Sequence, residues 1–195
     1  MDKIQPTMKI AFCGTQSSGK STLVKYLSLI PAFNTFEIFT EKSKEIRDIG
    51  IPLNMDSTLI GQIHFMSHRA LELLEPYFLS DRSIIDVMGY TKASSTMNYY
   101  EKEDFCKLAS NLIKEYDHIF YVSPVGVEIE DNKVREISVE YRETIDFIIL
   151  NLLRNYGYKI KNLHYIPKNL TVEQRAAFVL DKINIYNNKT QGKHE

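Results

Sequence analysis

Short apolar runs alternate with longer amphipathic segments along this chain. The runs have the length of single strands, and the segments between them repeat their apolar residues every three or four positions, as one face of a helix does. Strands are expected at 8–13, 36–39, 77–80, 118–122 and 163–166. Because parallel strands need a crossover between them, usually a helix, the alternation predicts an α/β fold in which helices flank a mostly parallel sheet.

Residues that start or stop helices divide the segments between these strands. Pro76 ends a long periodic segment at 56–74, Gly157 stops the segment before the last strand, and Thr171 is a good N-cap for a closing helix. Further helices are expected after the first strand, after the second strand as far as Ile46, and as two segments between Ser83 and Tyr116. Every predicted strand is therefore separated from the next by at least one helix.

A glycine-rich segment ending in lysine and hydroxyl residues follows the first strand directly. It reads Gly14-Thr15-Gln16-Ser17-Ser18-Gly19-Lys20-Ser21-Thr22. Glycine tolerates the backbone angles that curl a loop around an anion, and the helix that begins here adds the positive end of its dipole. Lys20 can reach the β- and γ-phosphates of a nucleotide, and the Ser21 hydroxyl can bind Mg²⁺. This segment predicts a nucleoside-triphosphate site; the simpler interpretation is a Gly/Ser-rich turn.

Composition limits the number of domains and the classes of function, but it does not identify a binding partner. The 195 residues form one expected domain, 1–195, with a frayed polar tail at about 187–195. A net charge of −1 gives no global basic field for nucleic acid, although a local basic groove is not excluded. Cys13 and Cys106 lack metal-ligand spacing and are expected to be reduced core thiols. The sequence shows no signal peptide and no apolar run of membrane-spanning length, so we expect a cytoplasmic protein without a membrane partner.

Charged residues follow the second and third predicted strands, at the sheet edge where ligands bind in open α/β folds. Asp81 can orient or deprotonate an acceptor hydroxyl or help to hold Mg²⁺, and Arg82 can bind phosphate oxygens through its forked guanidinium. Asp86 and Glu41 are further candidates for contact with the acceptor molecule. The alternative for the aspartate–arginine pair is a surface ion pair with a helix cap, and for Glu41 a solvated helix start.

Two arginines belong to the polar segment between the fourth strand and the next helix. Arg135 and Arg142 could neutralise charge that develops during phosphoryl transfer if this segment closes over a bound triphosphate. Each of them alone is equally compatible with a charged loop or an exposed helix face. His64 and His68 share a helix face, but no third ligand accompanies them in the sequence, so a zinc site is not expected there.

The order of these motifs resembles that of a P-loop kinase group which contains ribosylnicotinamide kinases, thymidylate-kinase-like enzymes and many small phage kinases. The resemblance covers nearly the whole chain and rests on Gly14 to Thr22, Glu41, Asp81-Arg82-Ser83 with Asp86, and the segment with Arg135 and Arg142. It implies a P-loop NTPase fold, a three-layer sandwich with a five-stranded parallel sheet and a small lid at about 123–142. It also implies Mg-ATP as the donor, with Asp81 or Glu41 near the acceptor.

Together these features predict a Mg-ATP-dependent kinase that acts on a nucleoside, a nucleotide or a nucleobase-linked hydroxyl. Lys20 and the loop amides would hold the triphosphate, and Ser21 would hold the Mg²⁺. Asp81 would position the attacking oxygen or help to hold the Mg²⁺, and Arg82, Arg135 and Arg142 would stabilise the phosphoryl oxygens. Two alternatives stay open: a phage DNA-modification kinase that phosphorylates 5-hydroxymethyluracil in DNA, and an ATPase or nucleotide-dependent binding protein. The choice of base between Asp81 and Glu41, the preference for ATP over GTP, and the oligomeric state are also open.

Overall fold

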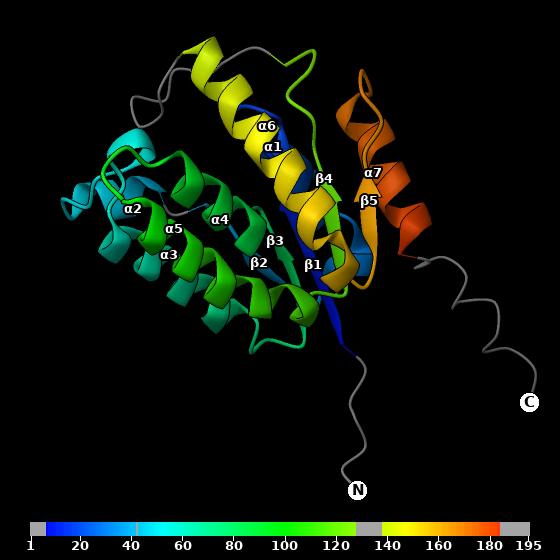
Figure 1. Cartoon of the computed structure of the whole chain (residues 1–195). Coiled ribbons are helices and arrows are strands. Elements are labelled where there is room, and N and C mark those ends of the chain that lie inside the picture. The colour runs from blue at the N-terminus through cyan, green and yellow to red at the C-terminus, as the bar shows by residue number, and fades with distance from the viewer. Residues whose placement is uncertain (1–6, 42, 128–137, 184–195) are drawn as a thin grey trace, which may run out of the picture.

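A single parallel sheet forms the centre of the molecule (Figure 1). The computed structural model describes residues 7–41, 43–127 and 138–183. The strands are β1 Met8–Cys13, β2 Glu37–Phe39, β3 Tyr77–Ser80, β4 His118–Tyr121 and β5 Leu163–Tyr165. They lie in the order β2-β3-β1-β4-β5, and every neighbouring pair is parallel. The predicted five-stranded parallel sheet is therefore confirmed, with strand bounds within one residue of those expected.

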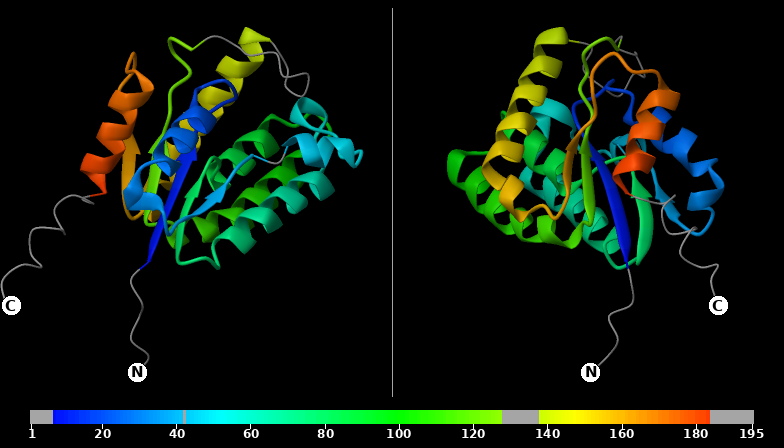
Figure 2. Two further views of the ribbon diagram at one scale, coloured as in Figure 1. Left: turned by 180° about the vertical axis from the view of Figure 1, so that it is seen from behind. Right: turned by 90° about the vertical axis from the view of Figure 1, so that its right-hand side faces the viewer.

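Helices cover both faces of this sheet (Figure 2). They are α1 Lys20–Ser28, α2 Ser43–Asp48, α3 Leu59–Glu72, α4 Ile84–Ala93, α5 Tyr99–Ala109, α6 Val139–Tyr156 and α7 Val172–Lys182. Helices α1 and α7 share one apolar core with one face of the sheet, whereas α4, α5 and α6 share another with the opposite face. Helix α3 packs beside α4. The sheet therefore lies between two layers of helices, which is the expected three-layer arrangement.

The central strand β1 shows why the sequence forms this sandwich. Ile10 and Phe12 pack on the side of α1 and α7, while Ala11 and Cys13 pack on the side of α4 and α6. Successive side chains of a strand point to opposite faces, so the part of a strand that helices cover on both sides, here residues 10–13, must be apolar at every position. The apolar run of β1 is thus the signature of a buried parallel strand.

Most of the predicted helix ends are confirmed, with two differences. Thr171 caps α7 as expected, in a reciprocal pair with Gln174. The helix expected at 56–74 is α3, which begins later, at Leu59, because residues 54–56 form a separate 3₁₀ turn. Helix α6 ends before Gly157, yet Gly157 has φ −56° and leads into another 3₁₀ turn, so its freedom to adopt a left-handed backbone is not used. None of the helices in the described ranges is long and apolar enough to cross a membrane.

Two histidines pack together where β4 joins the edge strand β5. His118 Nδ1 lies 3.0 Å from His164 Nε2, and the two rings stack with their centroids 5.3 Å apart. Burial, together with the nearby His164, lowers the pKa of His118 to about 4. In the unfolded chain His118 would take up a proton near pH 6.5, whereas in the folded chain it does so only near pH 4. The free energy of unfolding therefore decreases as the pH falls from 6.5 to 4.

We expect the free energy of unfolding to decrease by about 1 kcal/mol through His118 between pH 6.5 and 4, a figure that allows for solvent screening of a half-buried group. Urea unfolding over this pH range measures the decrease. The variant His118→Phe keeps an aromatic ring against Phe120 but removes the titrating group, so its stability should depend less on pH. An equal decrease in both proteins would show that His118 does not contribute to acid sensitivity.

Candidate active site

The glycine-rich loop between β1 and α1 owes its shape to two close approaches of the backbone. Gly14 has φ 147°, and a Cβ atom built on it would lie 2.4 Å from the carbonyl oxygen of Val122. Gly19 has φ 85° and is the N-cap residue of α1. Both positions favour glycine, the first because a neighbouring strand end leaves no room and the second because its backbone is left-handed.

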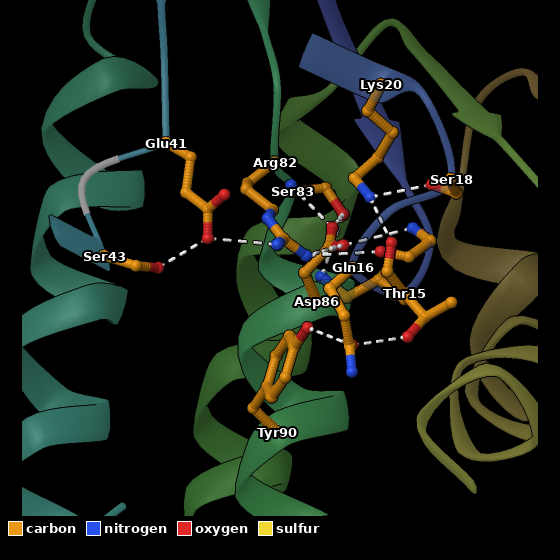
Figure 3. A network of polar contacts seen from close by, with 12 residues as sticks. Thr15, Gln16, Ser18, Lys20, Glu41, Ser43, Arg82, Ser83, Asp86 and Tyr90 are labelled. Carbon is orange, nitrogen blue, oxygen red and sulfur yellow. Dashed lines mark hydrogen bonds and ion pairs between the residues drawn. The ribbon is translucent and has the colours of Figure 1, made fainter. Parts of the chain in front are cut away.

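Lys20 is the first residue of α1 and folds back over this loop. Its Nζ donates to the carbonyl oxygen of Thr15 at 2.6 Å and to the Ser18 hydroxyl at 2.9 Å (Figure 3). The side chain is buried. The ammonium group is thus held inside the loop that the sequence predicts to bind phosphates, and it can exchange these neutral acceptors for phosphate oxygens.

Asp81 follows β3 directly and carries an unusual carboxylate. The residue is 2% exposed, and its Oδ1 has no hydrogen-bond partner in the described parts of the chain. Burial raises the pKa of Asp81, opposed by the charges of Lys20 and Arg82 and by a hydrogen bond from Ser21. A hydroxyl and an unsatisfied carboxylate oxygen side by side are oxygen ligands of the kind that Mg²⁺ prefers. These residues therefore fit the predicted Mg²⁺ site.

That site would hold the ion with few protein ligands. Within residues 7–41, 43–127 and 138–183, no group of three or more His, Cys, Asp or Glu side chains could enclose a metal. Mg²⁺ commonly keeps several water molecules and binds substrate phosphates together with one or two protein oxygens. Ser21 and Asp81 match that sparse arrangement, whereas a structural zinc site would need more protein ligands.

Arg82 joins the loop to two carboxylates. Its Nη1 lies 3.2 Å from both the carbonyl oxygen of Gly14 and Asp86 Oδ1, and its Nη2 lies 3.1 Å from Glu41 Oε1 (Figure 3). The side chain is buried, so the alternative of a surface ion pair does not describe this arginine. One guanidinium thus connects the ends of β1 and β3 with the segment after β2.

Besides pairing with Arg82, Asp86 accepts hydrogen bonds from Gly14 and Ser83. Oδ1 accepts from the backbone N–H of Gly14 at 3.1 Å, and Oδ2 accepts from the backbone N–H and hydroxyl of Ser83 at 2.8 and 2.9 Å. Ser83 in turn caps α4. The sequence placed Asp86 among the candidate acceptor-binding residues, and it does line the pocket described next. Its contacts add a structural role, since they bind the first residue of the loop to the start of α4.

A pocket opens beside Arg82, between α3, α4 and the segment after β2. It encloses about 640 Å³ including its open mouth. Its lining consists of Glu41, Ser43, Leu53, Asn54, Ser57, Gln62, Phe65, Arg69, Arg82, Asp86, Val87 and Tyr90. Ser57 Oγ and Gln62 Oε1 are buried there without a hydrogen-bond partner among the described residues. Such atoms favour a ligand that supplies matching polar groups.

Glu41 and Tyr90 connect this pocket with the rest of the site. Glu41 Oε1 accepts from the Ser43 hydroxyl at 2.5 Å as well as from Arg82, so its carboxylate stands at the pocket wall. The Tyr90 hydroxyl donates to Gln16 Oε1 at 3.0 Å, which links the pocket to the glycine-rich loop. Glu41 thus lies just before α2, with a mostly buried side chain, so the alternative of a solvated helix start does not describe it.

The two predicted lid arginines have different outcomes. Arg135 lies outside the described residues. Arg142, in the first turns of α6, donates through Nη1 to the carbonyl oxygen of Val127 at 2.8 Å. One turn further along α6, Asp146 accepts from the Tyr121 hydroxyl at 2.8 Å. Burial raises the pKa of Asp146, opposed by the hydrogen bond from Tyr121 and by the charges of Lys20, Lys168 and Arg142.

Sequence reasoning missed one arginine that contacts the loop. Arg175, on α7, donates through Nη1 to the carbonyl oxygen of Ser18 at 2.9 Å. No local motif marks it. The available signal was its position on the helix, since Arg175 lies among the apolar positions Ala176 and Val179 that pack against the sheet.

Comparison with known proteins supports this architecture. Deoxyadenosine kinase from M. mycoides with dCMP and a flexible dCDP bound is 18% identical at a TM-score of 0.67, over 91% of this chain and 99% of that one. NadR protein in complex with NR is 18% identical at a TM-score of 0.72, over 94% of this chain and 52% of that one. The present chain thus spans about half of NadR. No curated protein matches the sequence.

These solved structures share the fold of an α/β P-loop NTPase with the chain. At the level of sequence, one family model matches residues 9–175, from the first strand to the arginine behind the loop. That model is described as an AAA domain, and because it covers most of the chain, the protein belongs to this P-loop family.

Proposed function

We propose that this protein is a Mg-ATP-dependent kinase that transfers the γ-phosphoryl group to a nucleoside or nucleotide. The observation that carries the proposal is the shared wall between two binding regions. The glycine-rich loop suits a polyphosphate, the pocket beside it suits a small polar molecule, and Arg82 contacts the loop and lines the pocket. An ATPase that transfers phosphate only to water has no need of a second enclosed pocket.

The residues then divide into a donor group and an acceptor group. Lys20 and the loop amides bind the triphosphate, while Ser21 and Asp81 hold Mg²⁺, which would neutralise charge on the β- and γ-phosphates. Arg82 and Arg142 stabilise the oxygens of the group in transfer, and Arg135 remains a candidate for the same role. In the transfer step the acceptor oxygen bonds to the γ-phosphorus, the bond to the bridging oxygen of ADP breaks, and a carboxylate accepts the hydroxyl proton.

Glu41 is the better candidate for that carboxylate. Glu41 lines the pocket, where the acceptor hydroxyl would lie, whereas Asp81 interacts with Ser21 and Lys20 on the donor side. This assignment refines the expectation from sequence, which gave the positioning of the attacking oxygen to Asp81. The nucleotide-bound deoxyadenosine kinase and the NR-bound NadR suggest the class of acceptor to test first.

An acceptor screen with ATP labelled in the γ-phosphate tests the proposed function. The panel contains nucleosides, nucleoside monophosphates, ribosylnicotinamide, and DNA with and without 5-hydroxymethyluracil. A kinase should consume ATP slowly alone and faster with its acceptor, and the label should move to that acceptor. Free labelled phosphate as the only product would favour the ATPase alternative, and label on modified DNA alone would favour the DNA-modification alternative.

Two isosteric variants separate the roles of the carboxylates. Glu41→Gln should lower the turnover number at least about a hundredfold, because a general base is lost, while Mg-ATP affinity remains near that of the wild type. Asp81→Asn should instead weaken the Mg²⁺-dependent part of ATP binding. Titration calorimetry with and without Mg²⁺ and steady-state kinetics measure the two effects. The reverse pattern would assign the base to Asp81.

A further inference from the structure

Arg175 is a buried cation directly behind the glycine-rich loop. It comes from α7, the last helix, which packs beside α1 on the same face of the sheet (Figure 2). The residue is 8% exposed. Nη1 donates to the carbonyl oxygen of Ser18 at 2.9 Å, and Nε donates to that of Leu170 at 3.2 Å. The guanidinium therefore connects the loop with the turn before α7.

This arginine differs from the other buried arginines in the described ranges. Arg69 pairs with Glu72 at 2.6 Å, and Arg82 pairs with both Glu41 and Asp86. Arg175 forms no ion pair with a described carboxylate and has only carbonyl oxygens as hydrogen-bond acceptors. Burial lowers its pKa, although a guanidinium stays charged at any physiological pH. A desolvated charge without an opposite charge is costly unless a ligand supplies one.

The peptide between Ser18 and Gly19 gives this charge a route to the ligand. The described chain contains no cis peptide bond, so the C=O and N–H of this peptide point in opposite directions. Its C=O points to Arg175, and its N–H therefore points away from Arg175. Gly19 is the N-cap of α1, where N–H groups are available to an anion. A cation on the carbonyl side polarises the peptide and strengthens its N–H as a donor.

We propose that Arg175 is a positioning residue of the triphosphate site, whose charge is compensated when a nucleoside polyphosphate binds in the loop. The inference rests on the proposed function, because it requires that the loop binds a polyphosphate. It extends the donor site beyond the motif of residues 14–22 to the last helix of the domain. The contribution comes from the charge of Arg175, acting through the Ser18–Gly19 peptide, rather than from the hydrogen bond alone.

A pair of variants separates the charge from the hydrogen bond. Arg175→Lys keeps the positive charge, whereas Arg175→Gln keeps a neutral hydrogen-bond donor. We expect Arg175→Gln to weaken Mg-ATP binding about tenfold or more, which is typical for the loss of a charged hydrogen-bonding group, and Arg175→Lys to stay within about threefold of the wild type. Calorimetry with Mg-ATP, Mg-ADP and AMP measures this, and the loss for Arg175→Gln should be smallest for AMP.

Arg154→Gln is the matched control, because it removes the same charge from an exposed position on α6. Its Mg-ATP affinity should equal that of the wild type. Thermal melting shows that each variant is folded at the temperature of the titration. Retained affinity in Arg175→Gln, or equal losses in the Lys and Gln variants, would overturn the inference while the proposed function stands. Absence of Mg-ATP binding by the wild-type protein would instead overturn the proposed function, and the inference with it.

Discussion

Replacing Lys20 with Ala is expected to lower the rate of phosphoryl transfer at least about a hundredfold, as losses of preorganised charge stabilisation do. The ammonium lies inside the loop that is expected to bind the phosphates, against Thr15 and Ser18. Because Lys20 belongs to neither apolar core, the fold should remain intact. Steady-state kinetics with the acceptor found in the screen measure the loss.

Lys25→Ala is the matched control for this experiment. Lys25 lies on the same helix, α1, but is exposed. Its replacement changes the net charge equally and should leave the rate near that of the wild type. Near-normal turnover in a folded Lys20→Ala protein would remove Lys20 from the catalytic group and weaken the case for a kinase.

Replacing Asp86 with Ala is expected to reduce the free energy of unfolding by roughly 3–5 kcal/mol, the usual range when one partner of a buried ion pair is removed. The change leaves Arg82 without one of its two carboxylates and the N–H groups of Gly14 and Ser83 without their acceptor. Buried donors without acceptors add to the cost. Urea denaturation monitored by circular dichroism measures the difference.

An exposed aspartate provides the comparison for the Asp86 variant. Asp104 lies on the surface of α5, and Asp104→Ala should change stability by no more than about 0.5 kcal/mol. Asp86→Asn, which retains one acceptor oxygen, should fall between the two. A loss below about 1 kcal/mol for Asp86→Ala would show that Asp86 does not hold the loop to α4, and would leave only its place in the pocket lining.

The position of Arg82 has a consequence for both halves of the proposed reaction. The same guanidinium contacts the first residue of the loop, the candidate base Glu41 and the structural carboxylate Asp86. The proposed donor and acceptor regions therefore share a buried side chain rather than an exposed one. Proximity of this kind is a large part of what an enzyme contributes to phosphoryl transfer, since there is little covalent chemistry to assist.

The sequence by itself determined the features that depend on neighbouring residues. Alternation of strands and helices predicted the parallel sheet, because the periods of the two elements and the need for crossovers act locally. The spacing from Gly14 to Thr22 predicted the anion loop for the same reason, since one short segment forms it. The carboxyl ends of parallel strands meet at one edge, which brought Glu41 and Asp81 to the same site.

Only the tertiary structure decided which of these residues touch and which roles they divide. From the sequence alone, Arg82 could have contacted solvent or phosphate. It pairs with Glu41 and Asp86 because of how three strand ends pack together. Arg175 lies 157 positions beyond Ser18, and no spacing rule connects a helix to a loop at that separation. Local patterns specify elements and short motifs, whereas contacts between distant segments depend on burial and packing that the whole chain determines at once.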